Sequence, residues 1–329
     1  MLGLLVSFDF SFMPTILLFF FVLIGITGLV LGGRWLTDGA IGISSFFNIS
    51  PLIVGLTVVS IATSMPEMFT CLTAIQESAD LALGSIIGSN IANIGLILGI
   101  SALIAPLASD IRLIRKELPF LIFLTFLFVL FALGGFGRIE GIILVSIAFA
   151  YVVWVVRNSL KESSNNYLDE DLSFKSASRS NLMFALIWII LGTIFLSLGA
   201  QCLVSSAQQL ALRIGVSEVF VGFSVVALGT SLPELAASVS ASFAKKNSLC
   251  IGNVIGSNLF NLALIGGTSA CFYPFPVSSS FFWVEFPLLI FSTILLFFFL
   301  RKTDSLIGMK QGVVLITLYL LVIVLIGLK

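Results

Sequence analysis

Apolar stretches about as long as a helix needs to cross a bilayer recur along almost the whole chain. Of the 329 residues, 59% are hydrophobic and only 10% are charged, so the apolar surface exceeds what a soluble core would bury. We therefore expect an all-α integral membrane protein with ten transmembrane helices. The expected spans are residues 14–33, 52–75, 81–105, 118–133, 139–157, 182–203, 219–243, 250–272, 282–300 and 311–328.

The distribution of basic residues predicts the orientation of these spans. With ten spans and an external N-terminus, 13 of the 16 Lys and Arg residues fall on the inner side, and only Arg138, Arg213 and Lys329 fall outside. Such a bias follows the positive-inside rule and supports two external termini. The net charge is zero, so composition does not point to a nucleic acid as partner, and no protein partner is implied.

One long polar stretch, residues 158–181, divides the chain into two halves and reads as a cytoplasmic linker. The predicted domains are therefore residues 1–157, the linker, and residues 182–329. Each half holds five expected spans. Because five is odd, two homologous halves would enter the membrane in opposite directions, which is the inverted-repeat plan of many transporters.

The two halves carry the same two sequence blocks. Residues 54–67 read VGLTVVSIATSMPE and residues 221–234 read VGFSVVALGTSLPE, identical at eight of fourteen positions. Residues 84–94 (GSIIGSNIANI) match residues 252–262 (GNVIGSNLFNL) at six of eleven positions. The ungapped match within each block indicates an internal duplication.

Each copy of the first block ends in a glutamate, Glu67 or Glu234, well inside an apolar span. An ionisable side chain at such depth costs at least about 2.5 to 3.5 kcal/mol on insertion scales. Inverted repeats would bring the two carboxylates together near the midplane, where like charges repel strongly. Either the two glutamates share protons or a cation lies between them, and we favour the cation.

The residues around both glutamates offer oxygen ligands. Helical spacing places two hydroxyls on the face of each glutamate, and pairs a Ser with an Asn four residues later in each second block. Such oxygens suit Ca2+ or Na+. The predicted ligands are Thr63, Ser64, Glu67, Ser89 and Asn93 in the first half, and Thr230, Ser231, Glu234, Ser257 and Asn261 in the second.

Two further features of the blocks bear on this site. Pro66 and Pro233 cannot donate backbone hydrogen bonds, so each helix is expected to loosen one residue before its glutamate and to free carbonyl oxygens. Gly84, Gly88, Gly252 and Gly256 repeat at small-xxx-small spacing, and we interpret them as packing positions and not as ligands.

Enzymatic and purely structural roles remain as alternatives. The chain contains no histidine, which removes His-based metal sites and Ser-His catalysis, and its four cysteines show no metal-type spacing. An intramembrane enzyme would have to use the glutamate pair as acid and base without a paired nucleophile. We therefore expect neither an enzyme nor a prosthetic group.

The paired T-S-x-P-E and G-S-x-x-G-S-N blocks resemble the two alpha repeats of the cation/calcium antiporter superfamily, and most closely its prokaryotic sodium/calcium exchanger branch. The resemblance spans nearly the whole chain. It implies the ligand set given above, with backbone carbonyls near Ser60 and Ala227. It also implies alternating access in a prokaryotic cell (inner) membrane with both termini external, and exchange of Ca2+ for Na+.

The chain departs from the resembled pattern at two motif positions. Ala62 stands where Gly is usual, which is expected to alter the local bend. Asn261 stands where some relatives carry Asp, which leaves one fewer titratable group and weakens any case for K+ co-transport. A Ca2+/H+ antiporter, with the glutamates carrying protons in place of Na+, remains the alternative function.

Overall fold

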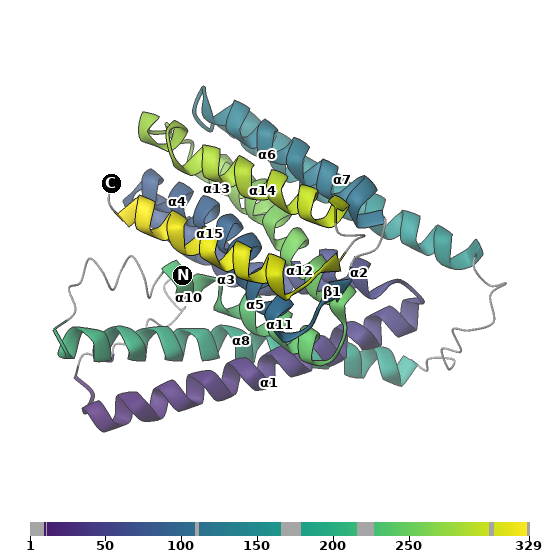
Figure 1. The fold of residues 1–329 in the computed structure, drawn as a ribbon, viewed down its shortest axis with the longest axis horizontal. Coiled ribbons are helices and arrows are strands. Elements are labelled where there is room, and N and C mark those ends of the chain that lie inside the picture. The colour runs from purple at the N-terminus through teal and green to yellow at the C-terminus, as the bar shows by residue number, and fades with distance from the viewer. Residues whose placement is uncertain are drawn as a thin grey trace.

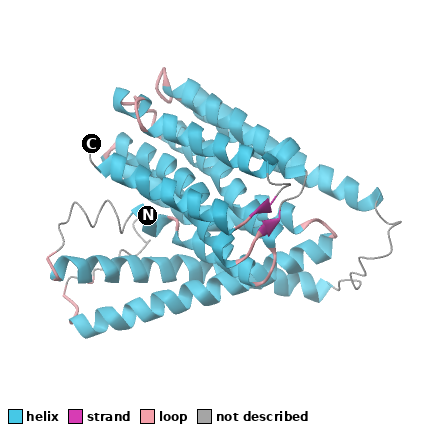
Figure 2. Cartoon of the chain, in the orientation of Figure 1, coloured by secondary structure: helices cyan, strands magenta, loops and turns pink. Residues whose placement is uncertain are grey.

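The structure is a computed structural model in which the described part is almost entirely helical (Figure 2). It describes residues 10, 12–108, 112–165, 179–215, 227–302 and 306–327. Within these ranges, seven helices are long and apolar enough to cross a membrane. The expectation of a helical, multi-pass membrane protein is therefore confirmed, while the count of ten spans stays a prediction.

The first half begins with the longest helix of that half, and π-helical turns interrupt three of its later helices. Its elements are α1 (Thr15–Phe47), α2 (Pro51–Val54), η1 (Gly55–Val59), α3 (Ser60–Glu77), α4 (Ala79–Ala92), η2 (Asn93–Ile97), α5 (Leu98–Ile104), β1 (Leu107–Ala108), η3 (Leu113–Glu117), α6 (Leu118–Ala132) and α7 (Arg138–Asn165).

The described part of the second half has a similar order of helices, with one π-helical turn, η5. Its elements are α8 (Arg179–Arg213), α10 (Ala227–Thr230), α11 (Leu232–Phe243), α12 (Asn247–Phe260), η5 (Asn261–Ile265), α13 (Gly266–Phe272), the 3-10 turn η6 (Ser279–Phe282), α14 (Glu285–Lys302), β2 (Leu306–Ile307) and α15 (Met309–Gly327).

Several helices run beyond the ends that hydropathy predicted. At 1.5 Å per residue, the 33 residues of α1 span about 50 Å, more than the roughly 30 Å hydrocarbon core. Helix α7 continues to Asn165, so the start of the expected linker is helical, and residues 166–178 lie outside the described part. Hydropathy marks where apolar character stops, but a helix can continue into water.

Short polar signals set the junction between α1 and α2. Asn48 adopts a left-handed conformation (φ 51°) that asparagine tolerates, and it ends α1. Ser50 then caps α2, accepting a hydrogen bond from the Leu52 amide at 3.3 Å, and Pro51 occupies the first turn, where no amide donor is needed. The chain thus reverses within a few residues.

The second sequence block folds identically in the two halves. Helices α4 and α12 have 14 residues each, η2 and η5 have five, and α5 and α13 have seven. In the continuous segments Ala79–Ile104 and Asn247–Phe272, 78% and 94% of an apolar 18-residue stretch is buried. The corresponding share for α1 is 28%. These two segments therefore lie in the interior of the bundle.

Each half also reaches across to the other. Strand β1 pairs antiparallel with β2, and Phe136, between α6 and α7, exchanges backbone hydrogen bonds with Phe275, just after α13. Helix α5 packs against α15, and α7 packs against α13. Helices α1 and α8 lie side by side along most of their length at one side of the bundle (Figure 1).

Candidate ion-binding site

The two glutamates of the first blocks are buried, and each contacts the other half of the chain. Glu67 on α3 is 4% exposed and Glu234 on α11 is 0% exposed. The Ser64 hydroxyl lies 3.3 Å from Glu234 Oε1, and the Ser231 hydroxyl lies 3.4 Å from Glu67 Oε1. Each carboxylate thus lies beside a serine from the other half of the chain.

Two residues of the second blocks complete the surroundings of Glu67. The Ser89 and Asn261 side chains lie within hydrogen-bonding reach of its carboxylate. One amide atom of Asn261 faces Glu67 Oε2 at 3.1 Å and the Ser257 carbonyl oxygen at 3.2 Å, both of which are acceptors. That position suits an NH2 group that donates to both, or an oxygen that shares a cation with them.

Three buried oxygens of the predicted ligand set have no hydrogen-bond partner among the described residues. They are Glu234 Oε2, Asn93 Oδ1 and Ser257 Oγ. A buried polar atom without a partner costs about 1 to 3 kcal/mol, so such a group calls for an explanation. Bound cations supply one, because they satisfy several oxygens at once.

The two threonines of the predicted set differ in burial. Thr63 is 1% exposed, and its hydroxyl contacts the Ser60 carbonyl oxygen at 3.3 Å and lies within reach of Glu234. Thr230, at the end of α10, is half-buried. Ser60 is buried beside the site, whereas the burial of Ala227 lies outside the described part.

A break in the helix corrects the expected geometry of the second repeat. Helix α3 runs without interruption through Pro66, but α10 ends at Thr230 and α11 starts at Leu232, with Ser231 between them at φ −92° and ψ 6°. Pro233 therefore lies in the first turn of α11, where proline is tolerated, instead of kinking a continuous helix. Residues 216–226 of this expected span lie outside the described part.

Sequence patterns missed the π-helical turns. Asn93 is the first residue of η2, and Asn261 is the first residue of η5. Each Asn carbonyl oxygen accepts from the amide five residues on, at Leu98 or Gly266. Such turns occur often at functional sites because they widen the helix locally. The equivalent placement in both halves indicates that the turns position the two asparagine side chains.

Asn253 is a second residue that sequence reasoning passed over. It is 1% exposed, and its Oδ1 lies 3.4 Å from the Thr63 hydroxyl. Its Nδ2 donates to Ser238 Oγ at 3.0 Å and approaches the Glu234 carbonyl oxygen at 3.5 Å. Asn253 therefore joins α12 to both glutamate-bearing helices. The one available signal was its mismatch with Ser85 at the equivalent place in the duplicated block.

Glycine contacts agree with the packing interpretation in the second half. A Cβ on Gly252 would lie 2.5 Å from the Leu52 carbonyl oxygen, and one on Gly256 would lie 2.7 Å from that of Leu56. Helix α12 thus approaches α2 and η1 at backbone distance. For Gly84 and Gly88, the described residues place nothing within 4 Å of such a Cβ, so their role stays a prediction.

The donor chemistry of the site suits a hard, transported cation. In the described part of the chain, no group of three or more His, Cys, Asp or Glu side chains could hold a metal ion. The oxygens gathered here come from two carboxylates, hydroxyls, amides and backbone carbonyls, which suit Ca2+ or Na+. The four cysteines are free thiols, and three of them are buried.

Comparisons with known proteins agree with this chemistry. The model of the family described as sodium/calcium exchanger protein matches residues 17–157 and 184–328. Inner membrane protein YrbG of Escherichia coli is 34% identical over 233 residues, covering 69% of this chain and 71% of its own. The sodium/calcium exchanger MaX1 of Methanosarcina acetivorans is 29% identical, covering 92% of this chain and 96% of its own.

A solved structure of the sodium-calcium exchanger NCX_Mj superposes with a TM-score of 0.82 at 32% identity, covering 94% of this chain and 99% of that one. The likeness therefore extends over both halves and includes both pairs of duplicated blocks. The chain belongs to the sodium/calcium exchanger protein family.

Proposed function

We propose that this chain is a secondary antiporter that exchanges Ca2+ for Na+ at a site held jointly by Glu67 and Glu234. The observation that carries the proposal is the reciprocal contact of each carboxylate with a serine of the opposite repeat. Family membership supports the substrates and favours Na+ over H+ as the counter-ion. The homologues are exchangers, which also argues against an enzyme.

Charge balance couples the two ion fluxes in this proposal. Two ionised carboxylates match the charge of one Ca2+, so the loaded pocket can move between its two access states without unbalanced buried charge. An empty pocket would leave two like charges facing each other in a poor dielectric, which opposes the same movement. Transport in one direction therefore requires return of the other cation.

Neutral oxygens complete the proposed coordination. We assign ligand roles to the hydroxyls of Thr63, Ser64 and Ser89 with the amide of Asn93, and to their second-half counterparts. These counterparts are Thr230, Ser231, Ser257 and Asn261. The partnerless Oε2 of Glu234, Oδ1 of Asn93 and Oγ of Ser257 support this set, because a bound cation would satisfy them.

The proposed architecture has ten transmembrane helices in two inverted five-helix repeats. Seven spans meet the length and hydropathy criteria, and α6, the α10–α11 pair and α15 would provide three shorter ones. The basic residues support external termini and a cytoplasmic segment between α7 and α8. The resemblance to the prokaryotic exchanger branch supports a location in a prokaryotic inner membrane.

Thiol labelling tests the orientation. In Ser164→Cys, close to the end of α7, an impermeant thiol reagent should react only from the inside. In the matched variant Ser279→Cys, between α13 and α14, it should react only from the outside. Labelling of the first variant on intact cells would overturn the topology, and the parent chain supplies the background from its own cysteines.

Flux in sealed proteoliposomes tests the function. Ca2+ uptake should require an outward Na+ gradient, and a pH gradient imposed without Na+ should drive little. Uptake driven by the pH gradient alone would instead identify a Ca2+/H+ antiporter. Uptake independent of both gradients would contradict an antiporter.

A further inference from the structure

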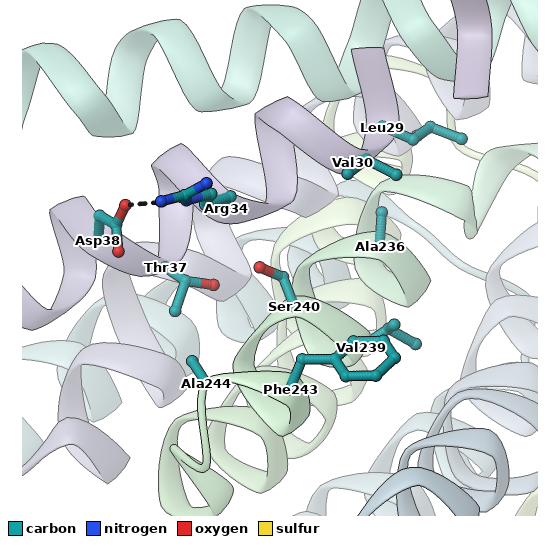
Figure 3. Close-up of a pocket in the computed structure, with 10 residues that line it drawn as sticks. All are labelled: Leu29, Val30, Arg34, Thr37, Asp38, Ala236, Val239, Ser240, Phe243 and Ala244. Atoms are coloured by element: carbon teal, nitrogen blue, oxygen red, sulfur yellow. Dashed lines mark ion pairs between the residues drawn. The ribbon is translucent and has the colours of Figure 1, made fainter. Parts of the chain in front are cut away.

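A groove lies between α1 and α11 (Figure 3). Its cavity is about 430 Å³. Thr37 on α1 and Ser240 on α11 face each other across it, while its other walls are mostly apolar. A groove on the outer surface of a membrane bundle lies where lipids lie, so its chemistry indicates which lipid fits.

The groove carries an exposed ion pair. Arg34 Nε lies 4.0 Å from Asp38 Oδ2, and the two side chains are 76% and 55% exposed. They are the two charged residues in the whole of α1. An exposed pair of this kind contributes only about 0 to 1 kcal/mol, so a ligand with matching charges can replace either partner at little cost.

One end of the groove lies at the depth of lipid headgroups. Ala244 lines it, directly after the end of α11, and the exposed Lys245 and Lys246 follow at once. Lysines at the end of a membrane helix mark the boundary with water. Arg34 and Asp38 line the same groove as Ala244, so they lie near that boundary and not at the centre of the bilayer.

We propose that this groove binds one aminophospholipid, phosphatidylethanolamine. Its phosphate would lie against Arg34, and its ammonium, joined to the phosphate through an ethylene group, would lie against Asp38. One acyl chain would run along the apolar walls formed by Leu29, Val30 and Val239. The zwitterionic headgroup carries one charge opposite to each member of the pair, whereas an anionic headgroup would be repelled by Asp38.

Native mass spectrometry tests lipid retention directly, after purification in mixtures of phosphatidylethanolamine, phosphatidylcholine and phosphatidylglycerol. The parent should retain one phosphatidylethanolamine in preference to phosphatidylcholine, whose methylated ammonium cannot donate hydrogen bonds. Asp38→Asn should lower that preference roughly fivefold, the ratio that corresponds to about 1 kcal/mol for a charge at the interface. Arg34→Gln should lower retention of phosphatidylethanolamine by a similar factor.

Two controls keep the test decisive. Lys310→Gln removes an exposed cation at the start of α15, away from the groove, and should leave retention unchanged. The double exchange Arg34→Asp with Asp38→Arg keeps both charges and should recover retention lost in the single variants, which excludes misfolding. Equal retention of all three lipids, or a preference for phosphatidylglycerol that ignores Asp38, would overturn the proposal. The readout does not involve transport, so its failure would leave the proposed function standing.

Discussion

The two glutamate-bearing segments come from one duplicated sequence block, yet their backbones differ. In the first half, α3 is continuous past Ala62 and Pro66. In the second half, Gly229 takes the place of Ala62, and the helix breaks at Ser231 before Pro233. Glycine lowers helix stability by about 1 kcal/mol relative to alanine, so one substitution can decide whether proline interrupts the helix or merely sits within it.

The immediate neighbours of the two carboxylates differ as well. Glu67 is surrounded by Ser231, Ser89 and Asn261, whereas Glu234 faces Thr63 and Ser64 and retains one oxygen without a described partner. The Asn253 side chain contacts the Thr63 hydroxyl and the Glu234 carbonyl oxygen. The first half has Ser85 at that place. The duplicated motif thus specifies which groups meet, while the surrounding helices specify how tightly each is held.

The largest expected effect comes from removing either charge. Glu67→Gln and Glu234→Gln keep side-chain shape and hydrogen bonding but leave one carboxylate to face a divalent cation. Each variant should abolish Ca2+ exchange in proteoliposomes while remaining inserted and folded. The comparison predicts equal loss, because charge balance does not depend on how each carboxylate is held. Parental flux in both variants at normal expression would show that the cation lies elsewhere.

Acidification should have the next largest effect and should be reversible. Protonation of either glutamate removes the charge that a divalent cation needs, as the Gln variants do. Ca2+ flux should therefore fall as pH is lowered, and raising the Ca2+ concentration should restore it. The initial rate measured across pH at several Ca2+ concentrations gives the answer. A flat profile through the usual carboxylate range would count against carboxylate ligation.

Removal of a neutral ligand should weaken transport less. Asn93→Ala and Asn261→Ala each delete an amide at the start of a π-helical turn, where a water can partly replace the oxygen. We expect roughly a tenfold higher KM for Ca2+ in each, equivalent to about 1.4 kcal/mol, with flux still measurable. Complete loss in either asparagine variant, with activity retained in a Gln variant, would reverse the assignment of charge and neutral ligands.

The smallest expected effect on transport comes from the difference between Asn253 in the second half and Ser85 in the first. Asn253→Ser gives the second half the residue of the first and removes the amide that contacts Thr63 and Ser238. KM for Ca2+ should rise about fivefold, the loss of roughly one hydrogen bond, with kcat nearly unchanged. The matched variant Ser85→Asn should leave KM as it is. A fall in kcat alone for Asn253→Ser would indicate a role in movement instead of in positioning.

The family and the helical membrane fold could be predicted because duplication and burial cost are visible in the residues. Of the predicted ligands, Ser64, Ser231 and Asn261 lie beside a glutamate, while coordination by the full set stays a prediction. The break at Ser231 and the π-helical turns at Asn93 and Asn261 were not predictable in the same way. Both depend on packing between helices distant in the chain, which overrides local propensity. Asn253 was overlooked because its role arises from contacts with α3 and α11 and not from its own motif.

The central claim is that one site, shared by both halves, holds Ca2+ and Na+ in competition. Isothermal titration of the purified chain in detergent tests it without any gradient. The account predicts one Ca2+ bound per chain, displaced as Na+ is raised, and no Ca2+ binding in Glu67→Gln or Glu234→Gln. Ca2+ binding that Na+ does not displace, or that survives in both variants, would contradict it.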